Sequence, residues 1–343
     1  MSARVVLITG VSRYLGGRLA AELSADDSIE RLIGVDVVPP RADVGRTEFV
    51  RADIRNPIIA KVIASAQVDT VVHMSVIATP FGAGGRTAMK EINVIGTMQL
   101  LAACQKAPSV NKLVVKSTTA VYGSSSRDPA LFTENMEPRR LPGSGYAKDS
   151  VEVEGYVRGL GRRRPDVDVT LLRFANFIGP SIDTPLTRYF ALPVVPKVFG
   201  FDPRMQFLHV DDGLEVLRRA VVEDHRGTFN VAGDGVMLLS QAIRRAGRTS
   251  FLLPSPAVSV VGSMFRRTGL VDFSPEQLNF LQFGRAVDTR RLREDFGYAP
   301  RFTTLSAFDD FVVGSGLQRI IDPDKIESIG RVAMSLAGVG RRA

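Results

Sequence analysis

The stretch Arg4–Gly17 constrains the fold of this chain more than any other. It begins with a short, continuous apolar run, which is typical of a parallel strand covered on both faces. Gly10 permits a tight turn after that strand, and Gly16 and Gly17 let the next helix pack closely, so that its N-terminal amides face an anion. Arg13 stands where such a turn usually has its middle glycine. The stretch therefore predicts a nucleotide-binding strand, turn and helix with an unusual centre.

An acidic residue follows at the spacing that a dinucleotide-binding unit requires. A second strand is predicted at Arg31–Asp36, and Asp36 lies 20 residues after Gly16. In such a unit the carboxylate accepts hydrogen bonds from the adenosine ribose hydroxyls and repels a 2′-phosphate. Asp36 therefore favours NAD as the cofactor. NADP stays as the alternative, because the Arg13 guanidinium could pair with a phosphate.

Strand and helix patterns alternate through the first half of the chain. Strands are predicted at 48–54, 68–74 and 112–117, and helices at 57–66 and 85–106. This alternation is typical of right-handed βαβ units. The predicted fold class is α/β, with a doubly wound parallel (Rossmann) sheet.

The second half predicts a smaller C-terminal substrate lobe. A sixth strand at 169–174 leads to an apolar, proline-rich and loop-rich region at 182–207, and a further strand at 228–233 is expected to complete the lobe. We expect a dinucleotide-binding domain at 1–180, a substrate-binding lobe at 181–320 that interleaves with the sheet around 206–232, and a C-terminal tail at 321–343.

Composition limits the partners of this chain. There are 44 Lys and Arg residues and 36 Asp and Glu residues, a net charge of +8, but the cations are spread out and no nucleic-acid motif accompanies them. We expect a small-molecule substrate and no nucleic acid. The single Cys104 excludes an intramolecular disulfide and a cysteine-based zinc site, and no metal site is predicted.

We expect a cytoplasmic protein, because neither a hydrophobic leader nor a bilayer-spanning run is evident. We interpret the apolar helix predicted at 253–265 as part of the core rather than as a membrane contact.

The motifs that follow the first turn stand in a characteristic order: Thr9-Gly10…Gly16, Asp36, Asp53-Ile54, Val72-His73, Asn93-Val94-Ile95-Gly96-Thr97, Ser117-Thr118-Thr119-Ala120-Val121-Tyr122-Gly123, Arg173-Phe174-Ala175-Asn176-Phe177-Ile178-Gly179-Pro180 and His209-Val210-Asp211-Asp212. This order resembles the extended short-chain dehydrogenase/reductase superfamily, in its NAD-dependent epimerase/dehydratase branch. Within that branch the chain is similar to bacterial proteins labelled UDP-glucose 4-epimerase.

The resemblance implies a set of binding residues. For the cofactor these are Gly10, Arg13, Tyr14, Leu15, Gly16, Asp36, Asp53, Ile54, His73, Asn93 and Lys148. For the substrate they are Thr118 and Asn176, the latter beside a diphosphate, and we add Arg188 and Arg204 as available cations. The resemblance also implies a homodimer that pairs through the helices carrying Asn93 and Lys148.

The catalytic motif departs from the pattern of the superfamily. The superfamily uses a Ser or Thr after the fifth strand, which Thr118 matches, and then a Tyr and a Lys four residues apart. Four residues turn a helix through about 400°, so those two side chains share a face. Here Tyr146 precedes Lys148 by only two residues, which is about 200° and opposite faces. Thr118, Tyr146 and Lys148 are nevertheless the candidate catalytic set.

Three arrangements can reconcile this motif with a site. In the first, which we favour, the helix starts near Tyr146, the preceding turn carries the phenol back into the cleft, and Lys148 lies on the nicotinamide ribose. In the second, Tyr146 holds the tyrosine position and Ser150 replaces the lysine. In the third, Ser144 holds the tyrosine position and does no acid or base work, because its alcohol pKa lies far above that of a phenol.

Two classes of function follow from these observations. The first is an NAD-dependent oxidoreductase or epimerase that acts on a secondary alcohol of a nucleotide sugar, with a lipid-like or steroid-like alcohol as a further possibility for the apolar lobe. The second is an NAD-binding sensor or scaffold with impaired catalysis. The register of Ser144 and Tyr146 discriminates between them, since it decides whether a proton-transfer group faces the cofactor.

Overall fold

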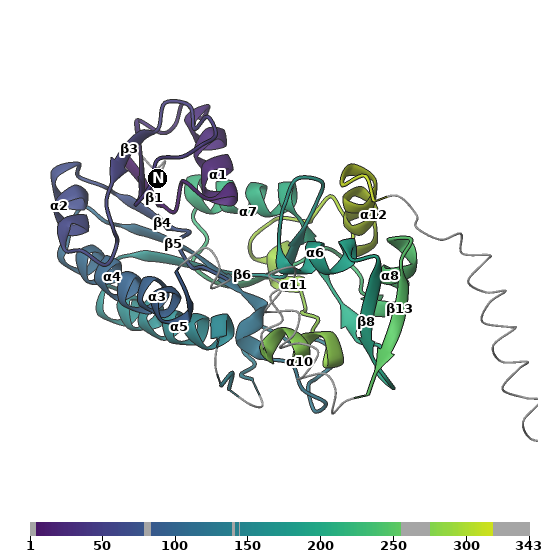
Figure 1. Cartoon of the computed structure of the whole chain (residues 1–343). Helices are drawn as coiled ribbons and strands as arrows, with labels where there is room; N and C mark the ends of the chain where they lie inside the picture. Colours follow the sequence, from purple (N-terminus) through teal and green to yellow (C-terminus); the bar gives the residue numbers. More distant parts are fainter. Residues whose placement is uncertain (1–4, 79–83, 139–140, 144, 255–274, 318–343) are drawn as a thin grey trace, which may run out of the picture.

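The fold centres on a seven-stranded parallel sheet, shown in Figure 1. The computed structural model describes residues 5–78, 84–138, 141–143, 145–254 and 275–317. The sheet has the order β11-β6-β5-β4-β1-β2-β3. Its strands are β1 (Val5–Thr9), β2 (Arg31–Asp36), β3 (Glu48–Arg51), β4 (Thr70–His73), β5 (Lys112–Thr118), β6 (Asp168–Phe174) and β11 (Gly227–Val231). The reversal of strand order between β1 and β4 confirms the predicted doubly wound fold.

Helices cover both faces of this sheet (Figure 1). The elements involved are α1 (Tyr14–Ser24), α2 (Ile58–Ser65), α3 (Arg86–Lys90), a π-helical turn (Glu91–Gly96), α4 (Thr97–Lys106), α5 (Gly145–Arg163) and α7 (Val210–Val222). Leu19 of α1 and Leu217 of α7 belong to one hydrophobic core, whereas Leu100 of α4 and Val157 of α5 belong to another. The helix predicted at 85–106 is thus helical from Arg86 to Lys106, with a π-helical turn at its centre.

A second lobe follows the sheet. It contains three two-stranded sheets, formed by β7 (Asn176–Ile178) with β10 (Phe207–His209), β8 (Val194–Val198) with β13 (Thr249–Leu253), and β9 (Arg204–Met205) with β12 (Met237–Leu238). Its helices are α6 (Pro185–Ala191), α8 (Leu239–Arg245), α10 (Pro275–Phe283) and α12 (Thr304–Gly314). Phe190 packs edge-on against Phe207 and Phe308, so an aromatic core holds this lobe together.

The structure corrects one strand assignment. We expected the strand at 228–233 to complete the second lobe, but β11 pairs in parallel with β6 and forms the edge of the main sheet. The chain therefore returns to the first domain after α7. The predicted helix at 253–265 falls mainly, and the tail at 321–343 entirely, outside the described residues.

A buried ion pair joins α5 to β6 beside the site. The Arg173 guanidinium donates to both carboxylate oxygens of Glu154, at 3.0 and 2.7 Å, and to the Tyr122 hydroxyl at 2.7 Å. Ser117 Oγ also donates to Glu154 at 2.7 Å. A buried pair of charges is tolerable when further hydrogen bonds satisfy it, so this network holds α5 and the end of β5 in one geometry.

Within the described ranges, the helices are too short or too polar for any of them to cross a membrane.

Candidate functional site

The glycine turn has the geometry of an anion site. Gly10 has φ +82° in the turn after β1, and a Cβ on Gly16 would lie 2.2 Å from the Gly10 carbonyl oxygen. Glycine is therefore required at both positions for α1 to approach β1. The helix begins at Tyr14, so the amides of its first turn have no partner within the helix and point toward the end of the sheet.

Arg13 takes the N-cap position of α1 in an extended conformation. Burial lowers the pKa of the Arg13 guanidinium, and the negative charge of Asp36 partly offsets that effect. Asp36 ends β2, and its carboxylate accepts hydrogen bonds from the Ser12 amide at 3.1 Å and the Val37 amide at 2.7 Å. A hydrogen bond between Ser12 and Asp36 thus links the turn to the acid.

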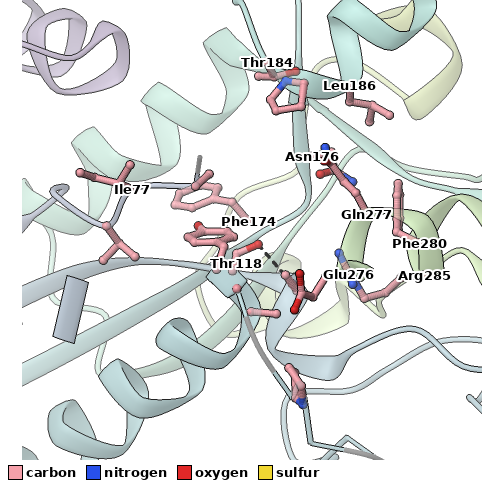
Figure 2. A pocket seen from close by; sticks show the side chains of 18 of the residues that line it. Ile77, Thr118, Phe174, Asn176, Thr184, Leu186, Glu276, Gln277, Phe280 and Arg285 are labelled. Carbon is pink, nitrogen blue, oxygen red and sulfur yellow. Dashed lines mark hydrogen bonds between the residues drawn. The ribbon is translucent and has the colours of Figure 1, made fainter. Parts of the chain in front are cut away.

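A cavity of about 1570 Å³ lies between the carboxyl ends of the parallel strands and the second lobe. Figure 2 shows Ile77, Phe174 and Thr118 on one side of it and Gln277, Phe280 and Arg285 on the other. Four of the predicted cofactor residues line its edge: Arg13, Tyr14, Leu15 and Gly16. Ligands of open α/β sheets bind in this position, at the point where the strand order reverses.

Thr118 and Tyr146 meet in this cavity. Thr118 ends β5, and its hydroxyl accepts a hydrogen bond from the Ala120 amide at 3.1 Å. Burial raises the pKa of the Tyr146 phenol to about 12, although side-chain hydrogen bonds with Thr118 and Ser150 and the positive charge of Arg285 act in the opposite direction. A phenol with such a pKa carries its proton at neutral pH and is able to donate it.

The structure corrects the interpretation of Lys148. Because α5 begins at Gly145, Tyr146 lies in its first turn and lines the cavity, whereas Lys148 is exposed and outside the lining. The residue four positions after Tyr146 is Ser150, which is buried and donates to the Tyr146 carbonyl oxygen at 2.9 Å. The second arrangement, with Tyr146 in the tyrosine position and serine in place of lysine, is the one that this geometry supports. Ser144 lies outside the described residues.

Two residues predicted to bind the cofactor are instead buried and position other parts of the fold. His73 and Asn93 are fully buried and do not line the cavity. Asn93 accepts from the Ile77 amide at 2.7 Å, donates to the Ile77 carbonyl at 2.9 Å and donates to Asp149 at 3.2 Å. Asn93 therefore positions Ile77, which lines the cavity, and α5, which carries Tyr146.

His73 holds together β1, β4 and α4. Its Nδ1 lies 3.0 Å from the Thr9 hydroxyl, and its Nε2 lies 2.8 Å from the Thr97 hydroxyl. Thr97 donates its own proton to the Asn93 carbonyl, so the network fits a neutral His73 with the proton on Nε2. The expected cofactor contact of His73 is thus replaced by a structural role.

Asp53 and Ile54 also lie outside the cavity lining. Arg55 forms an ion pair with the Asp53 carboxylate at 2.6 Å, and Ile54 is buried against Gly96. Both residues follow β3, next to the strand that carries Asp36.

The predicted substrate residues separate into two groups. Asn176 and Arg188 line the cavity, and the Arg188 guanidinium is paired with Asp183. Arg204 is exposed on β9 and does not line the cavity, which corrects its assignment to the substrate.

Three cations of the cavity were not among the predicted site residues: Arg86, which is paired with Asp149 at 2.6 Å, Lys116 and Arg285. Lys116 lies on β5 two residues before Thr118, and burial together with the charge of Arg13 lowers its pKa to about 8. The period of two in a strand was a signal for Lys116, because it places residues 116 and 118 on the same side. Arg285 follows α10 and has no motif in the sequence that marks it.

No cluster of metal-binding side chains occurs in the part of the chain that the structure describes.

Comparison with known proteins finds epimerases by the family model and among the relatives. A family model described as "NAD dependent epimerase/dehydratase family" matches residues 6–232. A protein of Mycobacterium tuberculosis described as uncharacterized is 51% identical, over 97% of this chain and 90% of its own length. UDP-glucose 4-epimerase 2 of Oryza sativa is 29% identical, over 51% of this chain and 45% of its own length.

Solved structures share the fold. The UDP-glucose 4-epimerase of Thermotoga maritima with UDP-glucose has a TM-score of 0.68 and 17% identity, over 90% of this chain and 97% of that one. The UDP-glucuronic acid 4-epimerase of Bacillus cereus, in complex with UDP-glucuronic acid and NAD, has a TM-score of 0.69 and 18% identity, over 91% of this chain and 98% of that one.

Proposed function

This chain belongs to the NAD dependent epimerase/dehydratase family, and from that premise we propose that it oxidises or epimerises a secondary alcohol of a nucleotide sugar. The observation that carries the proposal is the meeting of Thr118 and Tyr146 in a cavity that also contains the start of α1. A hydroxyl and a phenol beside an anion-binding helix terminus are the groups that such a reaction uses.

The residues present fit NAD. The Gly10 and Gly16 turn leaves no Cβ between β1 and α1, so a diphosphate can approach the amides of the first helical turn. Arg13 and Lys116 add two cations at the same end of the cavity. Asp36 would accept from the adenosine ribose hydroxyls, and its charge disfavours the 2′-phosphate of NADP.

When bound, NAD supplies the acceptor or donor of a hydride. The chain supplies the group that transfers the proton and the side chains that orient the substrate. In the reduction direction the Tyr146 phenol donates its proton to the carbonyl oxygen of the substrate, and in the oxidation direction the phenolate form of Tyr146 would accept the hydroxyl proton of the substrate. The Thr118 hydroxyl orients that substrate oxygen. Asn176 and Arg188, from β7 and α6, would hold the nucleotide part of the substrate.

A second function is favoured by one observation. The position four residues after Tyr146 is Ser150, so the first two turns of α5 bring no lysine to the phenol. A protein that binds NAD and turns over little is the corresponding alternative. A homodimer and a cytoplasmic location stay predictions of the sequence.

Binding and turnover measured separately distinguish these functions. We would titrate the full chain with NAD and with NADP by calorimetry, and then titrate the NAD-loaded protein with UDP-glucose, UDP-N-acetylglucosamine and UDP-glucuronate. Product analysis by NMR after incubation reports epimerisation or oxidation of the sugar. We expect NAD to bind at least tenfold more tightly than NADP, about 1.4 kcal/mol, because of Asp36.

Conversion of any UDP-sugar would support the enzyme. NAD binding without conversion of any of them would support the sensor or scaffold. A chain that binds neither NAD nor a UDP-sugar would contradict both functions.

A further inference from the structure

Arg285 is held rigidly at the side of the cavity. Gly284, with φ +72°, ends α10, and a Cβ there would lie 2.2 Å from the Arg204 carbonyl oxygen. That carbonyl accepts a hydrogen bond from the Arg285 amide at 3.1 Å. The close contact with β9 therefore fixes the backbone of Arg285, and Figure 2 shows its side chain directed into the cavity.

The Arg285 guanidinium donates its hydrogen bonds to neutral groups. Its Nε donates to the Thr119 hydroxyl at 3.2 Å, and its Nη1 donates to the Gly123 carbonyl at 2.9 Å and the Ser124 hydroxyl at 3.3 Å. The Phe280 ring lies 5.1 Å from the guanidinium carbon. Glu276 lines the same cavity, and Figure 2 shows it close to Arg285. Among the described residues, however, no ion pair joins Arg285 to Glu276 or to another carboxylate, and the hydrogen bonds of Arg285 use Nε and Nη1.

A guanidinium in this position is electrostatically costly. Burial lowers the pKa of Arg285 to about 10. The acid whose charge acts on it is Asp128, but both carboxylate oxygens of Asp128 already accept from Ser125, at 2.7 and 2.6 Å. A partly buried cation with no carboxylate bound to it is stabilised when an anion enters the cavity, and guanidinium nitrogens match a planar carboxylate in particular.

The position of Arg285 tells which part of a ligand it meets. Arg285 donates to Thr119, which is next to Thr118 in sequence. The positive charge of Arg285 also acts on the Tyr146 phenol. These are the groups at the reacting end of the site. The phosphate end lies at the start of α1, where Arg13 and Lys116 stand.

We infer that Arg285 is the receptor for a carboxylate on the sugar ring, so that the substrate is a nucleotide-linked uronate rather than a neutral hexose. The inference rests on the proposed function, because it presumes a nucleotide sugar in this cavity. It adds a specificity residue outside the Thr118 and Tyr146 pair.

The test compares two ligands that differ only at the sugar carboxylate. Calorimetry on the NAD-loaded chain gives Kd for UDP-glucuronate and for UDP-glucose. We expect UDP-glucuronate to bind about 10- to 100-fold more tightly. Arg285→Met should abolish this preference, and Arg285→Lys, which keeps the charge and loses the fork, should retain part of it. Arg290→Met is the matched control, because Arg290 is exposed and paired with Asp288.

Each outcome decides the inference. Equal affinity of the parent for the two ligands would overturn it, and so would a preference that survives in Arg285→Met. Loss of affinity for both ligands in that variant, with unchanged NAD affinity, would assign Arg285 to the diphosphate and overturn the carboxylate receptor. Failure of the parent to bind either UDP-sugar would refute the proposed function itself, which is a distinct result.

Discussion

At the scale of single residues, Tyr146 carries most of the proposed chemistry. Its neighbours Thr118, Ser150 and Arg285 come from three separate parts of the chain, and together they partly counter the effect of burial on the phenol pKa. Lys148, which is closest to Tyr146 in sequence among the cations, is exposed on another side of the helix. Burial, the residues Thr118 and Arg285 that the fold brings close, and Ser150 on the same helix therefore set the protonation of this phenol.

Tyr146→Phe should remove proton transfer and keep the shape of the cavity. We expect kcat for the converted UDP-sugar to fall about 10²- to 10⁴-fold, the usual contribution of a positioned acid or base, with little change in NAD affinity. Kinetics by NMR and calorimetry measure the two quantities. Tyr156→Phe is the control, because Tyr156 is a 39% exposed residue of the same helix. Equal kcat in Tyr146→Phe and the parent would contradict the assigned role.

At the scale of elements, the contact between β1 and α1 forms the anion site. Gly16 and Gly17 are buried at the point where the helix crosses the turn, and the amide of Gly17 donates to the Arg13 carbonyl at 2.8 Å. The loss of the usual middle glycine does not open this contact, because Arg13 takes an extended conformation before the helix begins. The element thus tolerates a side chain at position 13 but not at position 16.

Gly16→Ala tests this difference directly. The new Cβ would lie 2.2 Å from the Gly10 oxygen and 2.8 Å from its carbonyl carbon, so backbone must move. We expect a loss of about 1–3 kcal/mol in the free energy of unfolding and at least a tenfold weaker affinity for NAD. Urea unfolding and calorimetry measure these values.

Gly155→Ala is the matched control for a helical glycine. It lies in α5, is exposed, and has no atom within 4 Å of its added Cβ. We expect this variant to gain about 0.5–1 kcal/mol of stability, because alanine favours a helix more than glycine does. The same sign of effect at positions 16 and 155 would disprove the close-contact argument.

At the scale of the whole molecule, stability depends on pH through His73. Burial, together with the charge of Lys116, lowers the pKa of His73 to about 4. The ordinary pKa of 6.5 applies to the unfolded chain. Between these values the unfolded state binds more protons, so the free energy of unfolding rises with pH from about 4 to about 6.5. The full difference corresponds to about 3 kcal/mol, lost as the pH falls through this window.

His73→Asn should flatten this part of the stability profile. The amide keeps hydrogen-bonding capacity toward Thr9 and Thr97 and does not titrate. We expect the parent to lose about 3 kcal/mol more than the variant between pH 7 and pH 4, measured by urea unfolding at each pH. Parallel profiles for the two proteins would contradict a neutral, buried His73.

The local patterns of the sequence determined the dinucleotide-binding half. A strand, a glycine turn and a helix depend on contacts within a few residues, so the stretch from residue 4 to 17 and the acid at Asp36 predicted β1, α1 and the end of β2. The parallel sheet followed from the alternation of strands and helices. Thr118 was identified because it ends a strand and precedes a recognisable motif.

Tertiary structure alone decided the rest of the site. The start of α5 at Gly145 turned Tyr146 inward and Lys148 outward, and the pairing of β11 with β6 returned the chain to the first sheet. The charge of Arg285 acts on the Tyr146 phenol, and the backbone of Arg285 is positioned by the packing of Gly284 on Arg204 in the second lobe. Such contacts join residues far apart in the chain, and their energies depend on burial and neighbouring charge, which no local pattern contains.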